Sequence, residues 1–121
     1  MSNSEICFMP ATEMVQRIRA RELTCREVMK AHLAQIDRIN PVVNAIVTQI
    51  PRQELLAKAQ AADEDLVNGK TVGPLHGLPV AHKDLIPAKG LRTTLGSRIF
   101  RNDVPDYDGS VSYTHLTLPT N

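Results

Sequence analysis

The residues of this sequence best suited to chemistry are His82, Lys83 and Asp84, which follow an apolar run at 78–81. This run predicts a short strand that enters the protein interior and ends at Lys83. Desolvation at the end of such a strand favours the neutral amine, which can act as a general base toward a serine hydroxyl. The same residues also fit an ordinary surface ion pair between Lys83 and Asp84. From the residues alone, the ion pair is the preferred interpretation.

A glycine, a lysine and a threonine at 69–71 resemble the end of a phosphate-binding loop. That motif requires another glycine at position 64, where this sequence has Glu64. The three residues also follow a long helical pattern rather than a strand. We therefore interpret Gly69 as the left-handed residue that caps this helix.

The histidines and cysteines show no spacing typical of metal ligands. His76 and His82 are six residues apart and lack a third ligand, which indicates polar surface residues rather than a metal site. Cys7 and Cys25 match neither a zinc motif nor a disulfide framework. We therefore expect no metal and no cofactor.

Three helices are expected in the first half of the chain. Apolar residues at helical spacing predict the first over 11–20, and a capping box formed by Thr24 and Glu27 predicts the start of the second. The Asn-Pro dipeptide at 40–41 is expected to end the second helix, because a residue before proline is disfavoured in the helical conformation. A third helix is expected over about 52–68.

Outside these helices the sequence predicts loops and short strands. Residues 1–10 are interpreted as a loose lead-in, and the β-branched run at 45–48 predicts a short strand. After Gly69, frequent glycine and proline residues indicate loops around short strands such as 78–81.

The composition limits the classes of protein that this chain can represent. Its 121 residues allow one domain, and a net charge of +1 argues against binding nucleic acid through a broad cationic face. The absence of tryptophan, with two phenylalanines and two tyrosines, leaves a thin core and indicates a piece of a larger protein. Because the sequence has neither a signal-peptide pattern nor a long apolar span, we expect a cytoplasmic protein that does not enter membranes.

The end of the chain differs in character from the rest. Residues 110–121 contain no charged side chain. The ten residues VSYTHLTLPT at 111–120 equal one translated frame of a transposase-based sequencing adaptor. We therefore interpret 110–121 as a non-native, adaptor-derived tail and exclude it, with His115 and Tyr113, from the functional site.

Several segments resemble the amidase signature family, in the same order along the chain. The segments LTCREVMKAHLAQIDRINPVVNAIV at 23–47 and LLAKAQAADEDL at 55–66 resemble its opening helices. The segment PLHGLPVAHKDLIPAKGLRTTLGSRIF at 74–100, followed by VPDYD at 104–108, resembles the part that carries its lysine. The resemblance covers roughly residues 11–108.

The resemblance implies an α/β fold, in which a mixed twisted sheet has helices on both faces. Residues 1–109 would be the N-terminal part of a single, truncated amidase domain, contributing its leading helices and first short strands. Lys83 falls on the family's catalytic lysine. Four further residues fall on the following turn, which we interpret as structural: Thr93, Thr94, Gly96 and Ser97.

In this family a nucleophilic serine, a second serine in a cis peptide and the lysine form a triad that hydrolyses amides through an acyl-enzyme. Both serines would lie downstream of this chain, because Ser97, Ser110 and Ser112 do not match their positions. We therefore expect an amidase-type enzyme acting on a small-molecule amide, of which this chain alone is inactive. No residue can be assigned to substrate binding.

Two alternatives remain open at this point. Within the family, the chain resembles the amidotransferase subunit that supplies ammonia for misacylated tRNA. That subunit usually has Asp-Asn after the lysine, whereas Asp84 and Leu85 follow Lys83 here, as in stand-alone amidases. From another class, residues 11–69 fit a small helical interaction module, although the sequence offers few aromatic anchors for a partner.

Overall fold

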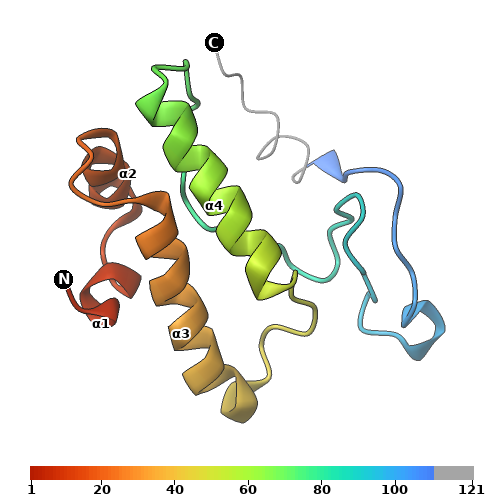
Figure 1. The fold of residues 1–121 in the computed structure, drawn as a ribbon. Coiled ribbons are helices and arrows are strands. Elements are labelled where there is room, and N and C mark those ends of the chain that lie inside the picture. The colour runs from red at the N-terminus through yellow and green to blue at the C-terminus, as the bar shows by residue number, and fades with distance from the viewer. Residues whose placement is uncertain (111–121) are drawn as a thin grey trace. The chain divides into compact units, whose positions relative to one another are not determined.

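A computed structural model describes residues 1–110 of the chain (Figure 1). Their helices are α1 (Asn3–Cys7), α2 (Ala11–Arg19), α3 (Cys25–Val43), α4 (Arg52–Val67) and the short 3₁₀-helix η1 (Arg98–Phe100). The chain divides into two compact units. The first contains Met1–Ala45 and Pro51–Pro79, and the second contains Ile46–Ile50 together with the residues from Val80 onward.

The start of α3 confirms the predicted capping box. The hydroxyl oxygen of Thr24 accepts the N–H of Glu27 at 3.1 Å, and the Glu27 carboxylate accepts the N–H of Thr24 at 2.9 Å. Two of the N–H groups that a helix start leaves unpaired are satisfied in this way. Hydrogen bonds from Thr24 hold the pKa of Glu27 below its ordinary value.

The interpretation of residues 1–10 as a loose lead-in is wrong, because they contain α1. The same type of capping box starts this helix: Ser2 accepts the N–H of Glu5 at 3.2 Å, and Glu5 accepts the N–H of Ser2 at 2.6 Å. Ile6 is buried on the inner side of α1. Ile6 belongs to the core of the first unit and Cys7 packs against that core, so apolar contacts dock this short helix there.

The prediction that α3 ends at 40–41 is also wrong. The helix contains Pro41 and continues to Val43. Pro41 lies in the last turn, so the lost N–H affects one backbone hydrogen bond and leaves the packed part of the helix intact. The helix ends at Asn44, which adopts a left-handed conformation with φ of 47° and donates its N–H to the Asn40 carbonyl at 2.7 Å.

The interpretation of Gly69 as a helix cap is confirmed at the end of α4. Gly69 has φ of +68° and donates its N–H to the Leu66 carbonyl at 3.2 Å. The next N–H, of Lys70, reaches the Asp65 carbonyl at 3.0 Å. This pair of bonds is the Schellman arrangement, and an ion pair between Lys70 and Asp65 accompanies it.

The core of the first unit forms around α3, which packs against α1 and α4 (Figure 1). Four side chains are less than 2% exposed: Ile18, Leu33, Val28 and Cys25. The wider core cluster contains Ile6, Met14, Ile18, Leu23, Cys25, Val28, Ala31 and Ala59. On α4, Ala59 belongs to this core, and Ala62 and Leu66 pack against it.

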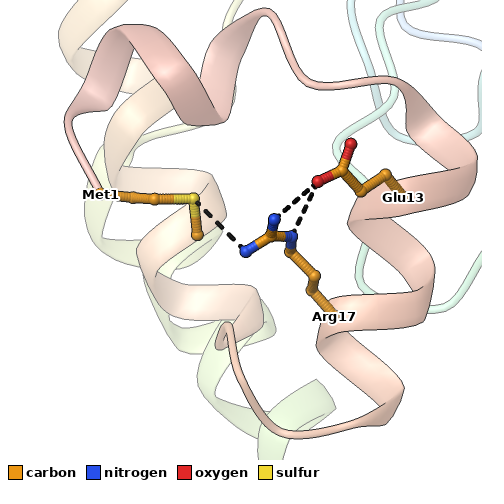
Figure 2. A network of polar contacts seen from close by, with 3 residues as sticks. All are labelled: Met1, Glu13 and Arg17. Atoms are coloured by element: carbon orange, nitrogen blue, oxygen red, sulfur yellow. Dashed lines mark hydrogen bonds and ion pairs between the residues drawn. The ribbon is translucent and has the colours of Figure 1, made fainter.

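A polar network joins the start of the chain to α2 (Figure 2). The Arg17 guanidinium donates to one carboxylate oxygen of Glu13 from Nε at 2.9 Å and from Nη2 at 2.7 Å. Its third nitrogen, Nη1, lies 4.0 Å from the Met1 sulfur. The pairing of Glu13 with Arg17 at four-residue spacing stabilises α2 modestly, as expected for partly exposed charges.

The strands expected at 45–48 and 78–81 are not present in residues 1–110, where neither segment has a regular secondary structure. A strand requires a neighbouring chain segment for its backbone groups, and sequence pattern alone does not supply one. In the second unit an isolated bridge joins Ala88 and Leu91. The remaining backbone pairing there consists of single bonds, such as Thr93 N–H to the Asp103 carbonyl at 3.0 Å.

Within the described part of the chain, no helix has the length and apolar character needed to cross a membrane. The proposed adaptor-derived tail at 110–121 lies outside the described residues except for Ser110.

Candidate functional site

Lys83 lies in the second unit, at the end of the extended segment that precedes a turn. The turn is closed by the N–H of Ile86, which donates to the Lys83 carbonyl at 2.9 Å. The Lys83 side chain is exposed. The expectation that Lys83 ends a buried strand and is desolvated there is therefore not met in this structure.

The ion pair between Lys83 and Asp84 is absent among the described residues, because Thr94 occupies the Asp84 carboxylate. One oxygen of Asp84 accepts the N–H of Thr94 at 2.8 Å, and the other accepts its hydroxyl. These bonds from Thr94 hold the pKa of Asp84 below its ordinary value. The Lys83 ammonium consequently has no ion-pair partner within residues 1–110.

The residues of the turn at 93–97 make hydrogen bonds within the second unit. Thr93 is 5% exposed, and its hydroxyl donates to the Leu91 carbonyl at 3.1 Å. Leu95 and Gly96 both have left-handed backbones, with φ of 53° and 67°. Ser97 accepts the N–H of Ile99 at 3.2 Å and so caps η1. Each of these polar groups has a local partner, which supports a structural role for the turn.

His76 is half-buried and holds the loop after α4 in place, so it is not the simple surface residue that was expected. Its Nε2 lies 2.8 Å from the Ala62 carbonyl oxygen, which can only accept, so Nε2 must carry the proton. Directly after it, Gly77 has φ of +83° and packs against Ile18 and Cys25. Within the first unit this loop is therefore fixed to the helices from both sides.

The two cysteines are free thiols, as the sequence analysis expected. Burial raises the pKa of Cys7, and burial together with the neighbouring Asp63 raises the pKa of Cys25 to about 12. Such thiols are poor nucleophiles and poor metal ligands. Across residues 1–110, no group of three or more His, Cys, Asp or Glu side chains is placed to hold a metal ion.

The arrangement around Lys83 provides an amine on a backbone that is fixed by the following turn. An unpaired amine can accept or donate a proton when a hydroxyl group is brought to it. The nearest serine downstream, Ser97, directs its hydroxyl oxygen to the N–H of Ile99 instead. None of the hydrogen bonds given for Ser97 involves Lys83.

Comparison with known proteins identifies the family to which this chain belongs. The family model of the amidases matches residues 27–114, which is more than half of the chain and includes most of α3, all of α4 and the segment around Lys83. The chain therefore belongs to the amidase family, whose activity is hydrolysis of amide C–N bonds. A helical interaction module at 11–69 does not account for a match that extends this far.

Individual relatives agree with this assignment. The A-subunit of the glutamyl-tRNA(Gln) amidotransferase of Alkalilimnicola ehrlichii is 46% identical over 99 residues, which are 82% of this chain and 20% of that protein. The A-subunit of the same enzyme in Streptomyces coelicolor is 38% identical over 109 residues, 90% of this chain and 22% of that protein. The chain thus spans about a fifth of the length of the curated relatives it matches.

A solved structure is also similar to this chain. It comes from work on a vestigial protein complex and the evolutionary origins of an s-triazine catabolic enzyme. Its TM-score is 0.74 at 30% identity, over 83% of this chain and 22% of that chain. The match supports an α/β class for the fold, although the sheet itself is not seen in residues 1–110.

The hydrogen bonds between Asp84 and Thr94 were missed by the sequence analysis. The two residues are ten positions apart, so neither helical nor strand periodicity relates them. A polar pair, Thr93 and Thr94, after a stretch rich in glycine and proline was the available signal. It indicated a turn without indicating which residue the turn would bind.

Proposed function

We propose that residues 1–109 are the N-terminal part of a longer amidase, and that Lys83 is the proton acceptor of its active site. The observation that carries the proposal concerns Lys83. This residue falls on the family's lysine, and its amine has no ion-pair partner among residues 1–110. The substrate class is a small-molecule amide. Both serines of the triad would come from the remainder of the protein.

In the proposed reaction, Lys83 takes a proton from the bridging serine, which takes one from the nucleophilic serine. The nucleophilic oxygen then attacks the amide carbon, and the resulting oxyanion is stabilised by backbone N–H groups. The C–N bond breaks, the amine leaves with the transferred proton, and an acyl-enzyme remains. Water attacks the acyl-enzyme and releases the acid, with protons moving through the same groups in reverse.

The test compares two proteins: the 121-residue chain, and the complete protein in which residues 1–109 are continued by the rest of their own reading frame. We expect amide hydrolysis from the complete protein and none from the chain. In the complete protein, Lys83→Ala and Lys83→Arg should both lower kcat/KM by at least about 10²–10⁴-fold, because arginine keeps the charge but cannot accept a proton.

Lys89→Arg is the matched control, since Lys89 is another exposed lysine of the second unit. It should leave kcat/KM unchanged. Near-normal activity of Lys83→Arg would show that Lys83 provides only a positive charge. Turnover by the 121-residue chain that disappears in Lys83→Ala would show that the chain is catalytically sufficient.

A second candidate function is that of an amidotransferase subunit, which the names of the curated relatives favour. The Asp84-Leu85 pair after the lysine favours a stand-alone amidase. The complete protein distinguishes the two when it is assayed alone and with the partner subunits of the Alkalilimnicola ehrlichii amidotransferase. Full turnover alone supports the stand-alone enzyme, and transfer activity that requires those subunits supports the second candidate.

A further inference from the structure

The side chain of Lys83 is not held by an ion pair among the described residues. It is exposed and forms no ion pair there, so the position of its amine depends on how firmly its backbone is fixed. A catalytic amine must be placed accurately, because a displacement of about 1 Å can lower a rate by about 10²-fold. Some neighbouring residue must therefore hold the backbone at Lys83.

Asp84, which follows Lys83, is bound through both its side chain and its backbone. Its carboxylate accepts the N–H of Thr94 at 2.8 Å and the Thr94 hydroxyl, and its main-chain carbonyl accepts the N–H of Leu95 at 3.1 Å. Both the side chain and the backbone of Asp84 are thus fixed to two consecutive residues. Because these two residues lie about ten positions downstream, the bonds close the whole segment 84–94 into one loop.

The turn at 94–96, which binds Asp84, has a strained backbone, and its hydrogen bonds hold that backbone in place. Leu95 has φ of 53°, a left-handed conformation that is unfavourable for a residue with a side chain. Leu95 is exposed, so burial does not compensate. The N–H that Leu95 gives to the Asp84 carbonyl, and the bond from Gly96 N–H to the Thr94 hydroxyl at 3.3 Å, stabilise the strained turn.

We propose that Asp84 is the positioning residue of Lys83: bound by Thr94 and Leu95, it fixes the backbone from which the lysine side chain extends. The proposal rests on the proposed function of Lys83. It also explains why the acidic neighbour does not neutralise the lysine, since Thr94 satisfies both carboxylate oxygens. The lowered pKa of Asp84 keeps the carboxylate ionised, and so a pure acceptor, at neutral pH.

The first arm of the test measures the backbone directly in the 121-residue chain by NMR. In the wild type we expect slow exchange of the Thr94 and Leu95 amide protons and a high order parameter at Lys83. Asp84→Ala and Thr94→Val should speed up that exchange and lower the order parameter, whereas Thr94→Ser keeps the hydroxyl and should restore both. Asp106→Ala, at another exposed acid of the unit, is the control and should change neither.

The second arm measures catalysis in the complete protein. Asp84→Ala and Thr94→Val should lower kcat by about 10–100-fold with little change in KM, and Thr94→Ser should recover most of the loss. Circular dichroism of the helices confirms that each variant folds. A loss of activity in Thr94→Ser equal to that in Thr94→Val would contradict the positioning role.

The two arms separate this proposal from the proposed function. An unchanged order parameter at Lys83 in both Asp84→Ala and Thr94→Val overturns the positioning role, whatever the activity of Lys83 variants. If Lys83→Ala retains full activity, the catalytic proposal fails and Asp84 has no catalytic group to position. Increased mobility at Lys83, together with a lower kcat and little change in KM, supports both the positioning role of Asp84 and the catalytic role of Lys83.

Discussion

The Asp63 carboxylate on α4 accepts the backbone N–H of Cys25 at the start of α3, at 2.7 Å. Its second oxygen accepts the N–H of Arg26 at 3.1 Å. Asp63 therefore satisfies two N–H groups that a helix start leaves free, and it does so from another helix. Together with the Thr24 and Glu27 box, this bonding fixes the start of α3 relative to α4.

Replacing Asp63 should destabilise the first unit. Asp63→Ala leaves two N–H groups without acceptors and removes a negative charge from a helix N-terminus, so we expect a loss of about 1–3 kcal/mol. The free energy of unfolding from urea titrations provides the measurement. Glu64→Ala, at the adjacent exposed acid, should cost well below about 1 kcal/mol. Equal losses in the two variants would contradict the capping role.

Gly77 should tolerate a side chain less well than Gly69. A Cβ there would lie 2.5 Å from the Cys25 sulfur and 3.2 Å from Ile18 Cδ1. Gly77→Ala should therefore cost about 2–4 kcal/mol, from left-handed strain plus overpacking. Gly69→Ala carries similar strain in open space and should cost about 1 kcal/mol, as measured by urea unfolding.

The double variant Gly77→Ala with Cys25→Ala identifies the cause of that loss. Removing the sulfur relieves the overlap, so the two substitutions should be less destabilising together than the sum of each alone. Strict additivity would show that conformational strain alone makes Gly77 intolerant.

The capping box should make stability depend on pH through Glu27. The pKa of Glu27 is lowered in the folded protein from its ordinary value of 4.5, so the unfolded chain binds the proton more readily. The stabilisation is complete above pH 4.5 and is lost as the pH falls through the lowered folded value. The free-energy difference between wild type and Glu27→Gln should therefore be largest at about pH 7 and shrink as the pH falls below the ordinary pKa of the carboxyl group. A difference that does not vary with pH would contradict this.

The two thiols should differ in reactivity. Cys25 is 1% exposed with a pKa raised to about 12, so its thiolate fraction at about pH 8 is about 10⁻⁴ and no reagent reaches it without local opening. Cys7 is half-buried and should react faster with a disulfide reagent. The variants Cys7→Ser and Cys25→Ser assign the two rates, and equal rates would contradict the burial of Cys25.

Local sequence motifs predicted α2, α3 and α4, but the capping box at the start of α1 was overlooked. Thr24 and Glu27 identified the start of α3, and Ser2 and Glu5 form the same motif at α1. The end of α3 was misjudged because the preference of a residue before proline was weighted above the packing of a long amphipathic helix. A capping box depends on two residues three positions apart, and this is why it is predictable.

The parts that could not be predicted depend on residues far apart in sequence. The segments 45–48 and 78–81 have a strand-like composition. A strand forms only when a neighbouring segment pairs with its backbone, and the periodicity of the sequence does not identify that neighbour. The hydrogen bonds from Thr94 to Asp84 likewise join residues that no sequence periodicity relates. The residues around Lys83 by themselves favoured an ion pair with Asp84, and only the resemblance to a family gave Lys83 a catalytic role.

Arg92 joins two stretches of the second unit that are distant in sequence. Its guanidinium donates to the Val47 carbonyl at 2.8 Å, the Thr48 hydroxyl at 3.1 Å and the Arg101 carbonyl at 3.2 Å. The connection between α3 and α4 thus belongs structurally to a unit whose remaining residues begin at Val80. A recombination event with a crossover between α4 and Val80 would separate Arg92 from the residues it binds. Recombination among relatives should therefore leave residues 47–48 and residue 92 from the same parent gene more often than random crossover would.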